Sequence, residues 1–205
     1  MAKCLATRLG YVYLDTGALY RAIAWKVQQE QLDPNNLAHM QALLARTDLR
    51  LMLSRDGLFI LVDGQVINQA VIRTPAISQL ASCIAAIQSV RDWLLPIQQK
   101  VVGEGGIIAE GRDMGTRVFP SADVKFFLDA ELEVRANRRQ QELVQQGKAI
   151  DLKTVRKDMV VRDERDRTRA VDPLRPASEA VMVDTSRQSV EEVVGHMMQI
   201  IADRL

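Results

Sequence analysis

The apolar segments of this chain alternate with longer amphipathic ones, and this alternation restricts the fold more than any other feature. A short apolar run of the buried-strand type spans Val124 to Leu128. A long charged helix is predicted next, from Glu131 to Gln146, and Gly147 stops it. The segment from Ile107 to Ala109 predicts another buried strand. Strands that alternate with helices in this way form a parallel sheet with helices on both faces, so an α/β fold is expected.

The rest of the chain mostly follows the same pattern. The first helix should end at Gly10, a glycine C-cap, although no Ser, Thr, Asp or Asn precedes it as an N-cap. The last helix carries a capping box, in which Glu192 lies three residues after Ser189. The other predicted strands and helices are Tyr11–Leu14, Ala18–Gln29, Leu37–Ala45, Thr74–Ile87, Val90–Val102, a helix capped by Asp151, Val181–Val183 and Val190–Leu205.

One segment breaks the alternation with a period of two. Leu49, Leu51 and Leu53 alternate with less apolar residues, and further strands are predicted from Leu58 to Val62 and from Gln65 to Ile67. The turns Ser54–Gly57 and Asp63–Gly64 join these strands and the loop Gly103–Gly106 precedes the strand at Ile107. Turns as short as the first two require antiparallel hairpins, so a small three-stranded antiparallel insert is expected.

The composition excludes several classes of protein. The chain has 205 residues, 47% of them hydrophobic, which is enough for one substantial core and one main domain. Its net charge is +1, so no global field favours nucleic acid or an anionic membrane, and an anion must be held by a local cluster. Cys4 and Cys83 are far apart and form no CxxC pair, which indicates a reduced cytoplasm. No apolar run approaches the roughly 18 to 20 residues of a membrane span, so a soluble cytoplasmic protein is expected.

The strand at Ile107 ends in the turn Glu110-Gly111-Arg112-Asp113, which is a candidate binding site. The carboxyl ends of strands are where open α/β sheets bind their ligands. An aspartate accepts a hydrogen bond from an amino group and repels a carbonyl, so Asp113 could read the exocyclic amine of cytosine or adenine. The alternative is a turn aspartate that caps local amides.

Arginines recur near the predicted strand ends and loops, at Arg21, Arg91, Arg112 and in the segment from Arg162 to Arg169. A guanidinium group matches phosphate oxygens with two parallel hydrogen bonds, so convergence of these arginines would favour a phosphorylated ligand. The alternative for each of them is ordinary surface charge.

Two further segments have both a functional and a structural interpretation. At about 100° per residue, Arg162, Asp166 and Arg169 fall within roughly 60° on one helix face, which could hold phosphates and ribose hydroxyls. The alternative is a solvated helix with i to i+4 ion pairs. The segment Asp15–Gly17 opens a helix whose first amides, with the Thr16 hydroxyl, could bind an anion, or it is simply an N-cap.

Other reactive residue types carry no site prediction. His39 and His196 lie on predicted helices without a partner motif and are interpreted as structural or surface residues. Met114, Trp25 and Trp93 are interpreted as packing residues. No metal site is predicted, because no His, Cys, Asp or Glu residues have the spacing of metal ligands.

Together these segments resemble the bacterial cytidylate kinases, which are nucleoside monophosphate kinases. The resemblance rests on YLDTGALYRA, IRTPAISQLASCIAAIQSVRDWL, IIAEGRDMGTRVFPSADVKFFLDA, RDERDRTRAVDPL and AVMVDTSRQSVEEVV, and it covers nearly the whole chain. It implies phosphoryl transfer from ATP, with Mg²⁺, to CMP or dCMP in a single P-loop kinase-like domain at 1–205. It also implies a nucleotide-binding insert at about 46–78, a helical lid at about 148–172, a monomer, and no nucleic-acid or membrane partner.

The resemblance also assigns roles by position. Arg112, Arg162 and Arg169 would act on phosphate as catalytic residues, the last from the lid. The substrate-binding residues would be Thr16 and Arg21 for the monophosphate, Ser82, Arg91 and Asp113 around the cytosine, and Asp166 for the ribose.

The sequence departs from the family's pattern at the start of the chain. The family begins with a buried strand and a GxxxxGK[ST] loop that cradles the donor phosphates, and no segment here matches that loop. Met1–Gly10 aligns with the following helix, so the first strand and P-loop are expected to be missing, the donor site incomplete, turnover slow and neighbouring strand edges unpaired. Either the sequence is an incomplete record of a working kinase that starts at an internal methionine, or it is a CMP-binding remnant. The intact acceptor residues favour the first interpretation, and a kinase for another base is a further alternative.

Overall fold

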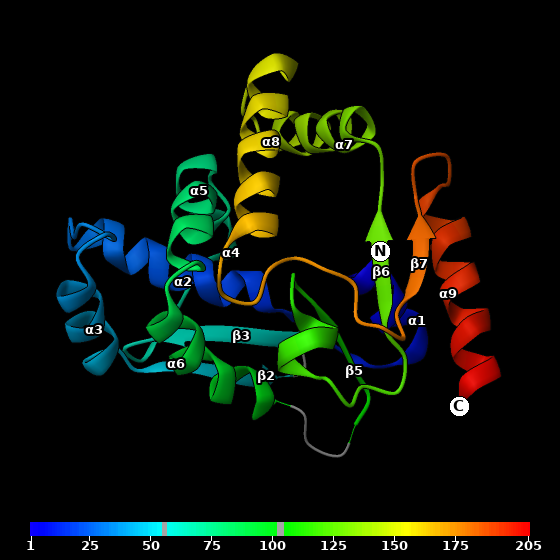
Figure 1. Ribbon diagram of the computed structural model, residues 1–205, viewed down its shortest axis with the longest axis horizontal. Helices are drawn as coiled ribbons and strands as arrows, with labels where there is room; N and C mark the ends of the chain where they lie inside the picture. The colour runs from blue at the N-terminus through cyan, green and yellow to red at the C-terminus, as the bar shows by residue number, and fades with distance from the viewer. Residues whose placement is uncertain (55–56, 102–104) are drawn as a thin grey trace.

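The computed structural model describes residues 1–54, 57–101 and 105–205 (Figure 1). The middle of the turn predicted at Ser54–Gly57, the end of the helix predicted to reach Val102 and the start of the loop predicted at Gly103–Gly106 lie outside these residues.

Four parallel strands form two separate pairs. β1 (Val12–Asp15) pairs with β5 (Ile107–Glu110), and β6 (Phe126–Asp129) pairs with β7 (Val181–Asp184). The predicted strands are confirmed, although β6 begins two residues later than predicted. Within the described ranges neither β5 nor β6 has a second partner, so the expected parallel sheet is present as two pairs with unpaired edges.

Two terminal helices join these pairs. α1 (Ala2–Leu9) contacts β1, β5 and α9 (Val190–Arg204), and α9 carries the predicted capping box (Figure 1). Their shared core contains five buried residues, namely Leu5, Val183, Val193, Val194 and Met197, with Ile108 of β5 and Phe126 of β6 packed against it. The hydrophobic effect therefore holds both pairs against one helical layer, although among the described residues the two pairs form separate sheets.

The antiparallel insert is confirmed. β2 (Leu49–Ser54), β3 (Gly57–Val62) and β4 (Gln65–Val66) form a sheet in that order. The sheet shares a larger core with several helices, among them α2 (Thr16–Gln29), α3 (Leu37–Ala45) and α6 (Gln88–Gln99). Trp25 and Trp93 are partly buried against this core, which confirms that they are packing residues.

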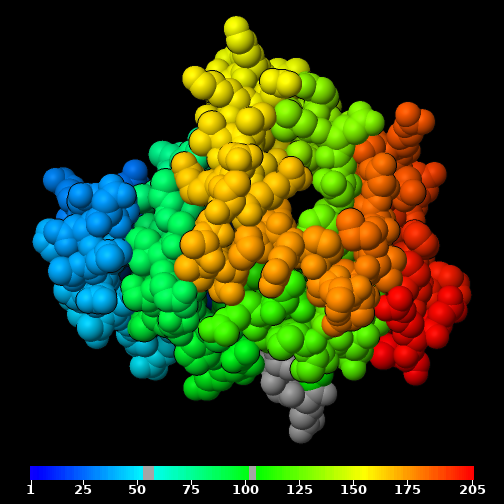
Figure 2. Space-filling view, in the orientation of Figure 1, coloured from blue at the N-terminus to red at the C-terminus, as the bar shows by residue number. Residues whose placement is uncertain are grey.

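Two charged helices project from the body of the molecule (Figure 1, Figure 2). α7 (Leu132–Gln145) packs against α8 (Leu152–Thr168), and α8 also packs against α5 (Pro75–Ile84). In α8 only Val155 and Asp166 are fully buried, so this helix is held by few apolar contacts. None of the described helices is both long enough and apolar enough to cross a membrane.

Three local differences separate prediction from structure. The helix predicted from Thr74 to Ile87 ends at Ile84, and a short helix that was not predicted, α4 (Gln69–Ile72), precedes it. After the Arg112-Asp113 turn the chain forms a single π-helical turn, η1 (Met114–Val118), which was not predicted. Gly115 lies so close to Lys125 that an added Cβ would be 2.9 Å from its Cδ, and this packing favours the tight turn.

Two glycine substitutions should change stability in opposite directions. Gly10 caps α1 at φ 68°, so Gly10→Ala should lower the free energy of unfolding by about 1 to 2 kcal/mol. Gly195 lies inside α9 with open space around its Cα, so Gly195→Ala should raise it by about 0.8 to 1 kcal/mol. Urea titration of both variants checks these values, and a stabilising Gly10→Ala would contradict the cap assignment.

Candidate functional site

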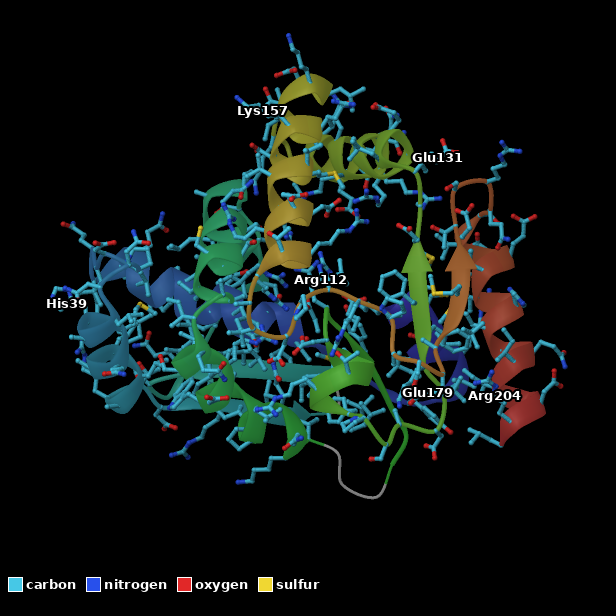
Figure 3. The ribbon with its side chains drawn as sticks, viewed as in Figure 1. His39, Arg112, Glu131, Lys157, Glu179 and Arg204 are labelled. Atoms are coloured by element: carbon cyan, nitrogen blue, oxygen red, sulfur yellow. The ribbon has the colours of Figure 1, made fainter. Side chains whose placement is uncertain are left out.

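An open cleft of about 510 Å³ lies at the carboxyl ends of β1 and β5, between α2, α5 and the end of α8. Arg112 marks it near the middle of the molecule (Figure 3). All nine residues singled out from the sequence line this one cleft: Thr16, Arg21, Ser82, Arg91, Arg112, Asp113, Arg162, Asp166 and Arg169. The structure thus brings together side chains from five separate segments, while the role of each stays a prediction.

The end of β1 forms the first wall of the cleft. Asp15 is the N-cap of α2: it accepts a hydrogen bond from the amide of Ala18 at 3.1 Å and ion-pairs with Arg21 at 2.6 Å and Arg73 at 2.8 Å. The Thr16 hydroxyl donates to the carbonyl of Glu110 at 2.8 Å, which ties α2 to β5. The N-cap interpretation of this segment is therefore confirmed, while Thr16 lines the cleft and anion binding there stays a prediction.

Arg21 and Arg162 are incompletely paired in the described structure. The Nε of each is buried and has no hydrogen-bond partner. Burial lowers the pKa of Arg21. It also lowers the pKa of Arg162, to about 10, with a further contribution from the charge of Arg112. Two desolvated guanidinium groups with free N–H groups are suited to bind an anion.

Asp166 connects three segments. Its side chain, 4% exposed, accepts from Arg112 Nε at 3.0 Å and from Ser82 Oγ at 3.2 Å. Arg162 Nε lies 3.7 Å from the same carboxylate, one helical turn away. The i to i+4 pair proposed as an alternative is thus present, but it lies in the cleft and not on a solvated face.

Arg91 and Asp113 form a buried ion pair on the opposite wall, with side chains 4% and 5% exposed. Arg91 also donates from Nε to Asp172 at 2.8 Å and from Nη1 to the carbonyl of Ala85 at 3.0 Å. Its guanidinium carbon lies 5.7 Å from the centre of the Tyr20 ring. Of the five N–H groups of an arginine, these bonds use three, so two remain for a ligand.

The predicted helix face of Arg162, Asp166 and Arg169 reaches the last turn of its helix, and all three residues line the cleft. α8 ends at Thr168, and Arg169 is its C-cap with a non-helical ψ of 140°. Asp172 has φ 42° and precedes proline, so the chain turns sharply here. The Arg169 side chain lines the cleft, and its Nε and Nη2 donate to the carbonyl of Asp172 at 2.9 and 2.6 Å.

Several cleft residues were not predicted. Gly111 is required here, because an added Cβ would lie 2.5 Å from Thr16 Oγ1 and 2.7 Å from Met114 Cε. Met114, predicted as a packing residue, packs beside Gly111 and Thr16. The remaining unpredicted lining residues are Gly17, Tyr20, Ser78, Ala81 and Ala85. A signal for the last three existed, because with Ser82 they follow the i, i+3, i+4, i+7 spacing of one helix face made only of small side chains.

A second cavity of about 590 Å³ lies at the carboxyl ends of β6 and β7. Three arginines of α7 line it, Arg135, Arg138 and Arg139. Arg138 donates to the carbonyl of Thr185 at 2.6 Å, and Arg135 ion-pairs with Asp163 of α8. These arginines were not predicted, because charged residues on a helix give no signal of the cavity that they line.

The two histidines lie outside both cavities. His39 is exposed on α3 (Figure 3) and His196 is exposed on α9, in agreement with their interpretation as surface residues. Charge in the first cleft is strongly unbalanced, with five arginines against two aspartates among its lining residues. This local excess, in a chain with a net charge of only +1, favours an anionic ligand.

Comparison with known proteins gives one consistent family. Residues 1–203 match the family model described as Cytidylate kinase. The chain is 38% identical to the Cytidylate kinase of Carboxydothermus hydrogenoformans over 201 residues, which cover 98% of this chain and 90% of that protein. It is 42% identical to that of Geobacter sulfurreducens over 204 residues, covering 100% of this chain and 87% of that protein. It is also 42% identical over 209 residues to a Bifunctional pantoate ligase/cytidylate kinase of Synechococcus elongatus, covering 100% of this chain and 40% of that protein.

Arg162 should oppose folding while it supports anion binding. Since folding lowers its pKa to about 10, its charged form is disfavoured in the folded state at every pH below that value. Arg162→Gln should therefore leave the free energy of unfolding unchanged or raise it by up to about 1 kcal/mol. The same change should weaken phosphate or CMP binding about tenfold.

Arg156→Gln is the matched control on the same helix, because Arg156 is half exposed and pairs with Glu133 outside the cleft. Denaturation of both variants measures the free energy of unfolding, and calorimetry measures the binding of phosphate or CMP. Equal loss of binding in the two variants would contradict a specific role for Arg162.

Proposed function

The chain belongs to the cytidylate kinase family, and we propose that it transfers the γ-phosphoryl group of ATP to CMP or dCMP, giving ADP and the diphosphate. The observation that carries this proposal is the cleft in which five arginines and two buried aspartates converge at the carboxyl ends of β1 and β5. Such a site has separate groups for a phosphate and for a base with an exocyclic amine.

The monophosphate would bind between Arg21, Arg112 and Arg162. The unpartnered Nε groups of Arg21 and Arg162 are the strongest support, because a phosphate would satisfy buried donors that are otherwise left unpaired. Arg112 is 40% exposed and bonded only through Nε in the described structure, so its terminal N–H groups are available to the same anion.

The cytosine would bind at Arg91 and Asp113. Cytosine presents an amine donor beside a ring nitrogen and a carbonyl, which both accept. Asp113 would accept from the amine, and the two N–H groups of Arg91 that remain would donate to the acceptors. Uracil reverses the donor and acceptor at two of these positions, so it would leave buried polar groups unpaired.

The ribose would lie against Asp166, whose carboxylate is buried among Ser82, Arg112 and Arg162. A carboxylate has about four lone-pair sites, so Asp166 can accept from a sugar hydroxyl beside its present donors. The 3′-hydroxyl is shared by CMP and dCMP, and both are therefore proposed as acceptors.

The donor nucleotide would use the second cavity, where Arg135, Arg138 and Arg139 lie at the carboxyl ends of β6 and β7.

Within the part of the chain that the structure describes, no cluster of three or more His, Cys, Asp or Glu side chains could hold a metal ion. These residues therefore do not form a Mg²⁺ site by themselves. Mg²⁺, when bound with ATP, neutralises phosphate charge.

Catalysis would rest on position and charge, since phosphoryl transfer needs no protein nucleophile. Arg112, Arg162 and Arg169 would stabilise the charge that develops between the two phosphates.

Residues 148–172 would act as a lid and residues 46–78 as the nucleotide-binding insert. Residues 1–205 would form one cytoplasmic, monomeric domain. The slight apolar burial of α8 supports movement of this lid.

Calorimetry and a coupled ADP-release assay test the proposal with CMP, dCMP, UMP, AMP and GMP as acceptors. We expect CMP and dCMP to be bound and phosphorylated in preference to the other three. Preference for another base would contradict the assignment of Asp113. Tight CMP binding without turnover would favour the alternative of a CMP-binding protein whose donor site is incomplete.

Asp113→Asn should reduce the preference for cytosine, because the amide presents a donor as well as an acceptor and loses the ion pair with Arg91. We expect kcat/KM for CMP to fall about 10- to 100-fold and that for UMP to change much less. Asp123→Asn, at an exposed residue outside the cleft, is the matched control. An unchanged ratio of CMP to UMP activity would contradict base reading by Asp113.

A further inference from the structure

Asp172 lies directly behind the cleft and carries no assigned role. We propose that Asp172 is a positioning residue that couples the lid arginine Arg169 to the base-reading arginine Arg91, so that base selection depends on lid position. The proposal rests on the proposed function for the identity of the ligand. The contacts of Asp172 with Arg91 and Arg169 do not depend on that function.

One residue supplies acceptors to two buried arginines. The Asp172 carboxylate accepts from Arg91 Nε at 2.8 Å, while its backbone carbonyl accepts from Arg169 Nε at 2.9 Å and Nη2 at 2.6 Å. Arg91 is 4% and Arg169 8% exposed, so water cannot readily replace these acceptors. Arg117 is the other charged group facing this carboxylate, with its Nε at 3.9 Å.

The backbone of Asp172 is held in an uncommon conformation. Its φ of 42° lies in the left-handed region, which aspartate tolerates better than most residues but still at a cost. This conformation directs the carbonyl toward Arg169 and the carboxylate toward Arg91 at the same residue. Strain that persists beside a ligand cleft is consistent with a functional requirement.

The electrostatics explain why such a connection is needed. Burial lowers the pKa of Arg169, and the nearby positive charge of Arg91 lowers it further, so these two guanidinium groups repel each other. Asp172 offsets that repulsion, because its carboxylate pairs with Arg91 and its carbonyl accepts from Arg169. Without its carboxylate, Arg91 would lose one of the three bonds that orient its fork, and Arg169 would be free to leave with the end of the lid.

Loss of the contact between Asp172 and Arg91 would then loosen the proposed base site. Arg91 would still pair with Asp113 and with the carbonyl of Ala85, so cytosine would still bind, but with a less fixed pair of N–H donors. Asp172 would thus make lid closure and recognition of the cytosine edge a single cooperative event.

Asp172→Gly and Asp172→Asn separate these contributions. Glycine keeps the positive φ without strain and keeps the carbonyl, while it removes the carboxylate. Asparagine keeps an acceptor oxygen and also tolerates this backbone conformation. Glu164→Ala removes a carboxylate from the exposed side of α8 and is the matched control.

In steady-state assays, Asp172→Gly should raise KM for CMP about tenfold and lower the ratio of CMP to UMP kcat/KM at least about fivefold. Asp172→Asn should retain most of both values, and Glu164→Ala should match the unmodified chain. Selectivity of Asp172→Gly equal to that of the unmodified chain would overturn the coupling.

Limited trypsin digestion of the ligand-free protein gives a second readout that does not depend on activity. Cleavage after Arg169 should be several times faster in Asp172→Gly than in Asp172→Asn, because only the former loses the connection to Arg91. Equal rates would overturn the proposal. If the unmodified chain does not bind CMP, the proposed function fails instead, while the digestion still reports whether Asp172 holds the lid.

Discussion

The buried carboxylate of Asp166 is the interaction on which the geometry of the cleft depends. It lies on a helix with few buried apolar side chains, and it bonds Ser82 of α5 and Arg112 of the turn after β5. Because hydrophobic contacts hold α8 only weakly, these polar bonds set where the helix end stands. The proposed lid is therefore positioned by the same charges that would bind the ligand.

The concentration of positive charge explains why the site is poised for an anion. The incompletely paired groups of Arg21 and Arg162 are disfavoured by burial in the free protein, and a phosphate would relieve both costs at once. Groups fixed in this way need little reorganisation when charge develops between two nucleotides. At the proposed site, stability in the absence of ligand would thus be given up for binding.

The sequence predicted which residues line the cleft better than it predicted the contacts among them. The strand ends, the Arg112-Asp113 turn and the insert follow from local periodicity and turn chemistry, and all nine candidate residues line one cleft. Helical spacing also placed Arg162, Asp166 and Arg169 on one face, and all three line the cleft, but it did not show that the helix ends at Thr168. Asp172 and the arginines of α7 were not predicted, since their contacts with Arg91, Thr185 and Asp163 join positions far apart in the sequence.

The sequence by itself determined the classes of element, the antiparallel insert and the chemistry available to the site, because periodicity, caps and side-chain functional groups are local properties. Only the tertiary structure decided which charges meet. Arg91 donates to Asp172, 81 positions away, and Arg112 to Asp166, 54 positions away. It likewise decided that the parallel strands stand as two pairs on one helical layer. Burial and long-range packing set these outcomes, and neither is encoded in any single segment.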